Sequence, residues 1–257
     1  MQPVRGILLD IDGVLHVSMK PIAGAAETLS WLEQHSYRFC CITNTTTMAR
    51  CTLARRLQGI GLPISEHFLV TAPVATASYI RQHFPGKRCW LLTKGDTAQD
   101  FVGIELVDAA ADVVVIGGAE ELLNYETMNK AFRMLMNGAA LLAMHTNLYW
   151  RTGDGLQLDS GPFVRALEIA SGKQAVVLGK PERAFFEQAL HLLDVTAGEA
   201  IAVGDDIEND IGAAQRAGLR ALFVTTGKHD KQSPLLEKIH PTAILPSIAD
   251  LPGWLQG

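Results

Sequence analysis

The chain begins with a short apolar run, residues 7–9, that leads directly into two aspartates and a glycine. A continuous apolar run that ends at a turn signal is typical of a strand buried on both faces of a parallel sheet. Asp10 then lies at the carboxyl end of that strand, where open α/β sheets bind their ligands. A β-hairpin is the alternative, because Asp12-Gly13 between apolar residues is a strong turn signal. The hairpin does not explain why a carboxylate, Asp10, stands at the carboxyl end of a buried strand, where it needs a partner or a metal.

Strand patterns alternate with helical patterns along the rest of the chain, without a repeat or a Pro- or Ser-rich linker. This alternation predicts an α/β fold with a doubly wound parallel sheet and right-handed crossovers. The predicted strands cover residues 7–10, 37–42, 67–70, 88–92, 112–116, 140–143, 175–178, 200–203 and 219–224. The predicted helices cover residues 21–34, 48–58, 75–83, 124–136, 162–170, 182–193, 211–217, 234–239 and 248–255.

Composition limits the function classes. The 257 residues are 48% hydrophobic and 19% charged, which suits a folded protein of one large or two modest domains. A net charge of -5 gives no basic footprint for nucleic acid, and no apolar run is long enough to span a membrane. The first strand leaves no room for a signal peptide, and the four cysteines lack C-x-x-C spacing. We therefore expect free thiols and a cytoplasmic location rather than a zinc site.

A long segment in the middle of the chain predicts a second domain. About 100 residues between Ala72 and Gly172 are too many for a loop, because structureless loops beyond about 15 residues are uncommon. We expect a catalytic core of residues 1–72 and 173–257, and an inserted α/β cap domain of residues 73–172 over the catalytic edge.

Residues of the insert that face a bound phosphate would set specificity. Asn147, Tyr149 and Arg151 precede the turn signal Gly153-Asp154-Gly155 and are our candidates. The alternative is that they are ordinary strand and turn residues.

Polar side chains follow several of the predicted strands. They are Asp10 and Asp12 after the first strand, Thr43 after the second, and Asp205, Asp206 and Asp210 after the strand at 200–203, with Lys180 before a helix. If these strands are neighbours, the groups share one edge of the sheet. Carboxylate oxygens suit Mg²⁺, which also takes waters and phosphate oxygens as ligands. Two unit charges 4 Å apart repel by roughly 4 kcal/mol at an effective dielectric of about 20, and Mg²⁺ with Lys180 would offset that.

This set of groups can carry out phosphoryl transfer. A carboxylate such as Asp10 attacks phosphorus and gives an acyl-phosphate that water hydrolyses. Asp12 can present a proton to the leaving oxygen, provided that its environment or the phosphate supports the protonated form. Thr43 and nearby backbone N–H groups would hold phosphate oxygens, and Lys180 would neutralise the developing charge.

Each feature has a structural alternative. The hydroxyl cluster at residues 43–47 could cap the following helix. Lys180 could be a solvated lysine before a proline that starts a helix. Asp205 and Asp206 could cap a helix, and Asp210 could be an exposed helical residue. The combination of all these residues is harder to explain structurally than any one of them.

Four motifs occur in a fixed order: Asp10-Ile11-Asp12-Gly13-Val14, Thr43-Asn44, Gly179-Lys180-Pro181, and Gly204-Asp205-Asp206 with Asp210. With this set, the chain resembles the haloacid dehalogenase (HAD) superfamily almost end to end. In having an aspartate at position 12, the chain resembles the phosphatases of this superfamily, since its dehalogenases lack that acid. The late insert resembles the C2 cap of subfamily IIA, the NagD-like group. The strings Gly161-Pro162-Phe163-Val164, Leu178-Gly179-Lys180-Pro181-Glu182 and Phe185-Phe186 are similar to the branch that includes phospholysine phosphohistidine inorganic pyrophosphate phosphatase.

The resemblance implies a Rossmann-like core with a C2-type cap, and a Mg²⁺-dependent phosphatase that works through an aspartyl-phosphate. It implies these roles: Asp10 as nucleophile; Asp12 as acid/base; the Asp10 and Asp205 carboxylates and the Asp12 backbone carbonyl as metal ligands; Thr43, Asn44 and Lys180 as phosphate ligands; and Asp206 and Asp210 as supports for metal waters or Lys180. The resemblance also allows a homodimer through the cap, because relatives of this type often dimerise there, but nothing in the sequence identifies an interface. Many capped relatives carry an aspartate where this chain has Tyr149, which puts substrates that rely on that acid in doubt.

The expected substrate is a small phosphorylated metabolite, with a phosphomonoester, a phosphoamide or pyrophosphate as the candidate bond types. Two other functions fit the same residues. A phosphomutase would return the phosphoryl group to a sugar phosphate, and a non-catalytic protein would only bind a phosphometabolite.

Overall fold

The computed structural model describes residues 3–152 and 155–257 of the chain, and the side chains of all of these except residues 151 and 152. The chain divides into two compact units. Unit 1 comprises Met1–Thr43, Cys51–Val70 and Lys180–Gly257, and unit 2 comprises Asn44–Arg50 and Thr71–Gly179. The segment predicted as an insert, residues 73–172, falls inside unit 2, which also takes in residues 44–50 and the chain as far as Gly179.

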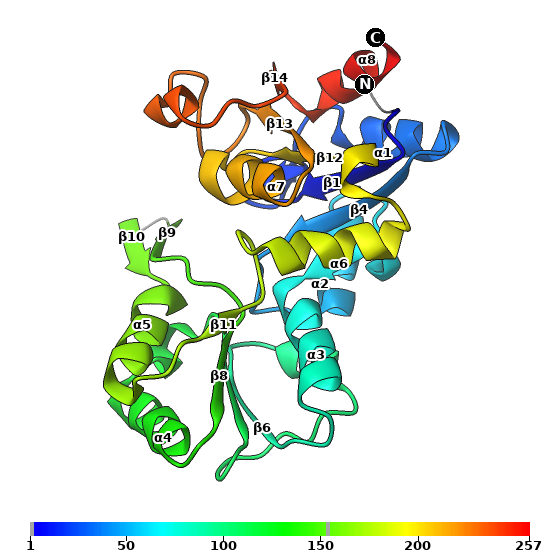
Figure 1. The fold of residues 1–257 in the computed structure, drawn as a ribbon. Helices are drawn as coiled ribbons and strands as arrows, with labels where there is room; N and C mark the ends of the chain where they lie inside the picture. The colour runs from blue at the N-terminus through cyan, green and yellow to red at the C-terminus, as the bar shows by residue number, and fades with distance from the viewer. Residues whose placement is uncertain (1–2, 153–154) are drawn as a thin grey trace. The chain divides into compact units, whose positions relative to one another are not determined.

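Unit 1 contains a six-stranded sheet in the order β14-β13-β12-β1-β4-β5 (Figure 1). Its strands are β1 (Gly6–Asp10), β4 (Arg38–Thr43), β5 (Leu69–Thr71), β12 (Ala200–Gly204), β13 (Arg220–Val224) and β14 (Ala243–Leu245). Strand β1 pairs in parallel with β4 and β12, and β13 pairs in parallel with β12 and β14. Every residue of β1 is buried, as its apolar sequence predicts for a strand covered on both faces. The predicted parallel sheet is confirmed.

Two groups of helices flank this sheet. The helical elements of unit 1 are α1 (Ala25–Gln34), α2 (Arg50–Gly59), η1 (Glu66–Phe68), α6 (Arg183–Leu193), η4 (Ala197–Glu199), η5 (Ile207–Gly212), α7 (Ala213–Arg216), η6 (Pro234–Glu237), η7 (Ile248–Asp250) and α8 (Leu251–Gln256). Helix α1 packs against η7 and α8, whereas α6 packs against α7 and against β1 and β4. Phe185, Phe186 and Ala189 are fully buried, so the helical spacing of these residues turns one face of α6 to the core.

The structure differs from several of the predicted elements of unit 1. The helix predicted from residue 21 begins at Ala25, because Pro21 belongs to a short hairpin of β2 (His16–Val17) and β3 (Lys20–Pro21). Residues 18 and 19 adopt the left-handed φ values of 49° and 60° that a two-residue hairpin turn requires. The helix predicted from residue 211 begins earlier, as the π-helix η5, and the helix predicted at 234–239 is the short 3₁₀ helix η6.

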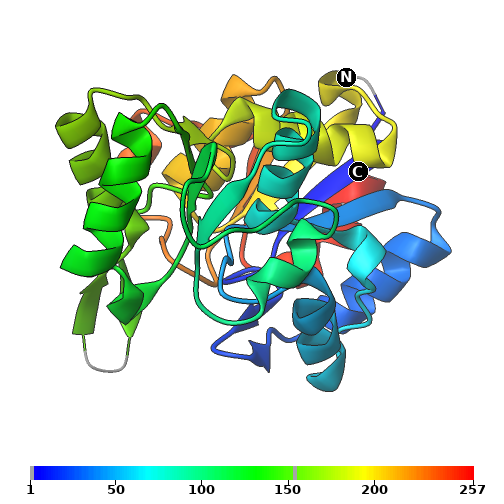
Figure 2. The ribbon, with the colours of Figure 1, turned by 90° about the horizontal axis from the view of Figure 1, so that it is seen from below.

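Unit 2 is a three-layer α/β structure around a four-stranded sheet in the order β11-β8-β7-β6. Its elements are α3 (Ala72–His83), β6 (Cys89–Leu92), η2 (Thr97–Phe101), β7 (Val113–Ile116), η3 (Glu120–Leu122), α4 (Tyr125–Met136), β8 (Ala140–Ala143), α5 (Ser160–Ser171) and β11 (Val176–Val177). In β7, Val113 and Val115 belong to the core beneath α3, whereas Val114 and Ile116 belong to the core beneath α4 and α5. Figures 1 and 2 show α4 and α5 side by side on one face of the sheet and α3 on the other. Unit 2 therefore has hydrophobic cores of its own.

An antiparallel hairpin in unit 2 was not predicted from the sequence. It consists of β9 (Tyr149–Thr152) and β10 (Gly155–Leu158), with Tyr149 opposite Leu158. The turn predicted at Gly153-Asp154-Gly155 falls on residues 153–154, which lie outside the described residues. Among the helices that the structure describes, none combines the length and apolar character needed to cross a membrane.

Candidate active site

The parallel register of unit 1 brings the polar strand ends to one edge of its sheet. Asp10 lies opposite Ile42 of β4, so Thr43 is the next residue at this edge. On the other side, Leu9 of β1 lies opposite Val203 of β12, so Gly204 and then Asp205 follow at the same edge. Asp10, Thr43 and Asp205 are all buried there. The structure thus groups three of the predicted site residues.

A tight turn follows Asp10 and directs the backbone back along the sheet edge. The N–H groups of Leu15 and His16 donate to the carbonyl oxygen of Ile11 at 2.9 and 3.3 Å. Gly13 has a φ of 84°, which favours glycine, and a Cβ there would collide with the carboxylate of Asp205. Gly13 is therefore required both for the turn and for the close approach of Asp205.

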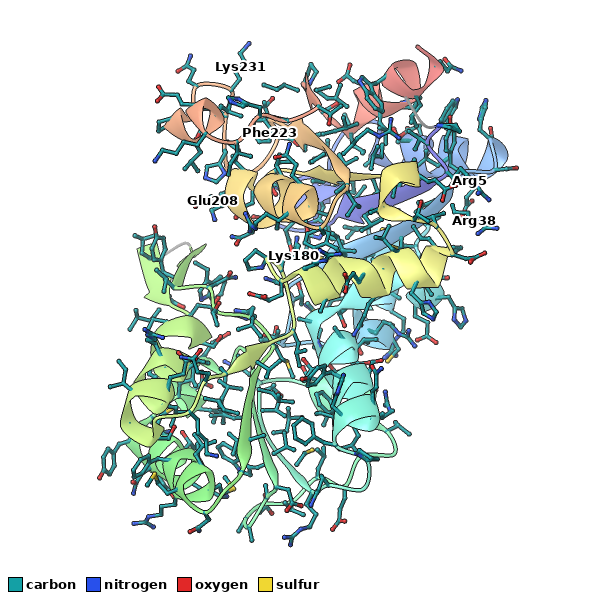
Figure 3. All side chains as sticks on the ribbon, viewed as in Figure 1. Arg5, Arg38, Lys180, Glu208, Phe223 and Lys231 are labelled. Atoms are coloured by element: carbon teal, nitrogen blue, oxygen red, sulfur yellow. The ribbon has the colours of Figure 1, made fainter. Side chains whose placement is uncertain are left out.

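Lys180 connects two of the buried carboxylates. Its Nζ donates to Asp10 Oδ1 at 2.5 Å and to Asp210 Oδ1 at 2.7 Å. Figure 3 shows Lys180 immediately before α6, far along the sheet from Arg5 and Arg38, which pair with acids at the amino ends of β1 and β4. Burial alone would lower the pKa of Lys180, but the two carboxylates outweigh burial and raise it, so the ammonium stays protonated.

Asp205 occupies a narrow space lined by backbone. A Cβ on Gly13 or on Gly227 would collide with its carboxylate, and the N–H of Lys228 donates to its Oδ2 at 2.5 Å. Burial, followed by the negative charge of Asp210, raises the pKa of Asp205 to about 6. Burial is also the largest cause of the raised pKa of Asp10, and Asp210 and Asp205 add to it against the opposing effect of Lys180.

These carboxylates form a set of oxygen ligands. Asp10, Asp205 and Asp210 each offer an oxygen within 4.8 Å of the others, and all three are buried. Three buried acids against the single charge of Lys180 leave a negative excess that is costly in a poorly solvated site. The raised pKa values of Asp10 and Asp205 report that cost, and a divalent cation would relieve it. A site that offers oxygen ligands alone fits Mg²⁺.

Asp206 and Asp210 organise the π-helix that follows β12. Asp206 accepts hydrogen bonds from the N–H groups of Glu208 and Asn209 at 3.0 and 3.1 Å, and from Lys228 Nζ at 2.6 Å. Burial would raise the pKa of Asp206, but Lys228 and Asn209 outweigh it and lower the pKa. Asp210 Oδ2 accepts the N–H of Asp206 at 3.1 Å, which leaves Oδ1 for Lys180. Within the predicted pair, Asp210 therefore contacts Lys180, and Asp206 caps η5 and contacts Lys228.

The side chain of Asp12 lies apart from the buried carboxylates. It is 68% exposed, and its Oδ1 is 3.7 Å from the Nδ1 of the buried His16. This exposure leaves the carboxyl group of Asp12 accessible to a ligand.

The remaining predicted residues belong to unit 2. Asn44 is the first residue of that unit, and its Oδ1 lies where a Cβ on Gly179 would collide with it. Asn147 donates its N–H to His145 Nδ1 at 3.4 Å and accepts the N–H of Gly161 at 3.0 Å. Tyr149 is exposed at the start of β9.

Arg151 pairs through its backbone with Leu156 in the β9–β10 hairpin, and its side chain lies outside the described part of the structure. The three specificity candidates therefore lie on the hairpin of unit 2 or on the loop before it.

Sequence reasoning missed the loop after β13. Thr226 Oγ1 donates to the carbonyl oxygen of Gly13 at 2.5 Å, and Gly227 and Lys228 line Asp205. The signal was present in the sequence. The polar run at residues 225–228 follows a predicted strand, as Asp205 follows its own strand.

The comparisons with known proteins agree with this geometry. The family described as haloacid dehalogenase-like hydrolase matches residues 7–106, and the related HAD-hydrolase-like family matches residues 177–251. The chain is 38% identical over 242 residues to haloacid dehalogenase-like hydrolase domain-containing protein 2 of Rattus norvegicus, covering 94% of this chain and 91% of the relative. It is 41% identical over 233 residues to human phospholysine phosphohistidine inorganic pyrophosphate phosphatase, covering 88% and 84% of the two chains.

Solved structures of the NagD-like group share the whole fold. The p-nitrophenyl phosphatase from Archaeoglobus fulgidus superposes with a TM-score of 0.91 at 27% identity, covering 97% of this chain and 98% of that one. NagD from E. coli K-12 superposes with a TM-score of 0.86 at 26% identity, with the same coverage. The chain, with its buried aspartates, its lysine and its two α/β units, belongs to the haloacid dehalogenase-like hydrolase family, in the NagD-like group.

Proposed function

We propose that this protein is a Mg²⁺-dependent phosphatase that hydrolyses small phosphorylated metabolites through an aspartyl-phosphate on Asp10. The observation that carries the proposal is the buried contact of Lys180 with Asp10 and Asp210, beside a third buried carboxylate, Asp205. A protein gains nothing in stability from this expensive excess of buried charge unless a ligand compensates it. A cation and a phosphoryl group are such ligands.

In the proposed reaction, a carboxylate oxygen of Asp10 attacks phosphorus, and the bond from phosphorus to the leaving oxygen breaks. Asp12 gives its proton to that oxygen. In the second step, Asp12 takes a proton from a water that attacks the aspartyl-phosphate, and phosphate is released. Lys180 and Thr43 neutralise and hold the phosphoryl oxygens during both steps.

The metal site is proposed from the donor set. Family resemblance assigns the ligands to the carboxylates of Asp10 and Asp205 and the backbone carbonyl of Asp12. The buried carboxylates and the raised pKa of Asp205 support a cation there. When bound, Mg²⁺ supplies charge neutralisation and aligns the phosphoryl group with the nucleophile. Asp210 also belongs to the carboxylate cluster, and its contact with Lys180 favours a supporting role.

The test is phosphate release from p-nitrophenyl phosphate with and without Mg²⁺. We expect Asp10→Asn to lose turnover to the detection limit, since an amide cannot form the acyl-phosphate. Asp194→Asn is the matched control, because Asp194 is exposed and lies at the amino-end edge of the sheet with Arg38. Equal rates for the native protein and Asp10→Asn would refute the nucleophile. Unchanged turnover after chelation of the metal would refute the Mg²⁺ dependence.

Two other functions make different products. A phosphomutase would convert one sugar phosphate into its isomer without net release of phosphate. A non-catalytic protein would bind phosphometabolites tightly and turn none of them over. Product analysis by ³¹P NMR over the same reactions separates all three functions.

The names of the relatives indicate which substrate classes to test. One relative is named for phospholysine, phosphohistidine and inorganic pyrophosphate, and one structural neighbour for p-nitrophenyl phosphate. We propose a screen of sugar phosphates, nucleotides, phosphoamino acids and pyrophosphate. Alanine variants of Asn147, Tyr149 and Arg151 should change the relative rates among these classes if those residues set specificity, and should change all rates equally if they do not.

A cytoplasmic location and a homodimer through the inserted unit complete the proposal. The four cysteines are present as free thiols, which suits a reducing compartment.

On the β9–β10 hairpin, Tyr149, Leu156 and Leu158 are each at least 60% exposed, and exposed apolar groups of this kind often mark an interface. Sedimentation analysis should show a dimer that Leu156→Lys and Leu158→Lys convert to a monomer. A monomeric native protein would refute the dimer.

A further inference from the structure

A buried histidine lies beside the proposed acid/base. His16 is only 4% exposed, yet its Nδ1 points to the carboxylate of Asp12, with Nδ1 and Oδ1 3.7 Å apart. The side chain of Asp12 is 68% exposed, so one buried and one exposed group face each other at the surface of unit 1. None of the roles described above uses His16.

The position of His16 follows from the turn after β1. The N–H of Gly13 donates to the carbonyl oxygen of His16 at 2.8 Å, and His16 donates its own N–H to Ile11 at 3.3 Å. His16 also pairs with Pro21 in the β2–β3 hairpin, which continues the turn. Thr226 Oγ1 holds the carbonyl oxygen of Gly13 from the other side. The backbone beneath the imidazole is thus fixed on three sides.

The imidazole nitrogen that faces Asp12 has no hydrogen-bond partner in the described part of the chain. Across the described residues, His16 Nδ1 is one of two buried side-chain nitrogen or oxygen atoms without one. Buried polar groups are nearly always paired, and an unpaired one in a native protein calls for an explanation such as a catalytic role. The distance of 3.7 Å is too long for a hydrogen bond, but catalytic contacts in ligand-free structures are often long and shorten when the substrate binds.

We propose that His16 is a positioning residue that donates its Nδ1–H to one carboxylate oxygen of Asp12 and so aims the other oxygen at the leaving group. This inference rests on the proposed phosphatase function. An exposed aspartate samples several rotamers, and a general acid must be held within about 0.5 Å of its productive position. A donor fixed in the buried turn supplies that restraint from within the same segment of chain.

The proton balance of the reaction does not involve His16. When the bond between phosphorus and the leaving oxygen breaks, Asp12 donates the proton, and it recovers one from the attacking water in the second step. His16 keeps its Nδ1 proton throughout both steps and acts through the orientation of Asp12.

The experiment measures kcat/KM for p-nitrophenyl phosphate, phenyl phosphate and substituted phenyl phosphates between them, with Mg²⁺. kcat/KM reports the steps up to loss of the leaving group. p-Nitrophenolate departs without a proton, whereas phenolate is more basic and needs one. We expect His16→Leu to reduce kcat/KM by about 10²-fold for phenyl phosphate and by less than about 3-fold for p-nitrophenyl phosphate. The dependence on leaving-group basicity is read from the ratio of kcat/KM between substrates of the same variant. A reduced folded fraction lowers kcat/KM equally for all substrates and so does not change this ratio.

Two further variants test the hydrogen bond itself. His16→Asn places an N–H close to the position of Nδ1 and should recover most of the loss, to within about 5-fold of the native kcat/KM for phenyl phosphate. In an Asp12→Asn background, His16→Leu should have no additional effect, because it acts through Asp12. His67→Leu, at an exposed histidine, is the matched control and should leave kcat/KM unchanged for every phenyl phosphate substrate.

The outcomes separate this inference from the proposed function. No hydrolysis by the native protein, or full activity of Asp10→Asn, would overturn both. Hydrolysis that depends on Asp10, with a His16→Leu loss that is equal for all leaving groups, would overturn the role of His16 alone. The role of His16 would also be overturned if His16→Asn is as impaired as His16→Leu. It would be overturned as well if the losses caused by His16→Leu and Asp12→Asn add fully in the double variant.

Discussion

At the scale of single residues, the site is controlled by buried charge. Asp10, Asp210 and Lys180 are almost completely shielded from water, and the ammonium contacts both carboxylates. Removing one partner from a buried ion pair leaves an uncompensated charge, and the typical cost is about 3–5 kcal/mol. The stability of unit 1 therefore depends on residues that we assign to chemistry.

Replacing Lys180 with methionine should destabilise the protein in a pH-dependent manner. Without the ammonium, the pKa of Asp10 rises further above its value in the unfolded chain, so the folded state takes up protons and regains stability as the pH falls. We expect a loss of about 3 kcal/mol at pH 7 and a smaller loss at pH 5. Urea unfolding at both pH values measures it, and Lys231→Met, at an exposed lysine, is the control. A loss that does not depend on pH would contradict the coupling.

Asp205 predicts how Mg²⁺ and pH act together. Its pKa is about 6 in the folded protein and about 3.9 in an unfolded chain, so the metal-free protein loses about 3 kcal/mol as the pH rises through this window. Mg²⁺ bound at the proposed site would require the ionised carboxylates and would therefore oppose that loss. The increase in Tm on adding Mg²⁺ should therefore be larger at pH 7 than at pH 5 and should disappear in Asp205→Asn. An equal increase at both pH values would argue against a metal at Asp205.

At the scale of elements, the junction of β12 and the π-helix η5 places the acids. Gly204 ends β12, and a Cβ there would collide with the side chain of Asp210. The extra residue in a π-helical turn changes the direction of the side chains that follow, and such turns are frequent at functional sites. Here that turn brings Asp210 back over Gly204 and into contact with Lys180.

Gly204→Ala should therefore displace Asp210 without altering any charged group. We expect a loss of about 1–3 kcal/mol of stability from the overpacked contact, together with reduced phosphatase activity. Gly59→Ala is the matched control. It lies at the end of α2 with open space around it, and alanine there should be neutral or slightly stabilising. Denaturant unfolding and p-nitrophenyl phosphate turnover measure both effects. Native activity in Gly204→Ala would contradict the placement of Asp210.

At the scale of the whole molecule, the chain forms two units with separate cores. The sheet of unit 1 and the sheet of unit 2 are each covered by their own helices, and the chain crosses between the units after Thr43, Arg50, Val70 and Gly179. Units with separate cores can open separately, because opening one exposes little of the core of the other.

Hydrogen exchange measured by mass spectrometry tests this independence. Leu135→Ala removes a buried side chain from the core beneath α4, and Leu222→Ala does the same in β13 of unit 1. Each substitution typically costs about 2–5 kcal/mol. We expect each variant to accelerate exchange in its own unit and to leave the other unit near the native rate. Acceleration of both units in either variant would show a single cooperative structure.

Much of the fold was predictable because it is encoded locally. Continuous apolar runs predicted the central strands, including β8 with its observed bounds, and amphipathic spacing predicted α4 and α6. The β2–β3 and β9–β10 hairpins and β14 were missed, since these short strands are largely exposed and lack the continuous apolar run that marks a buried strand. The π-helix was also missed, because apolar spacing does not distinguish its wider backbone hydrogen bonds, such as Ile211 N–H to the carbonyl oxygen of Asp206, from those of an α-helix.

The sequence by itself predicted that Asp10 and Asp205 lie at the sheet edge, because an acid after an apolar run reaches the end of a buried strand whatever the strand order. Only the tertiary structure decided which of these groups touch. The order β12-β1-β4 brought Asp205 and Thr43 to either side of Asp10. The π-helix turned Asp210 toward Lys180, and the turn after β1 placed His16 beneath Asp12. These contacts join residues far apart in the chain or depend on local backbone geometry, and spacing in the sequence carries no information about either.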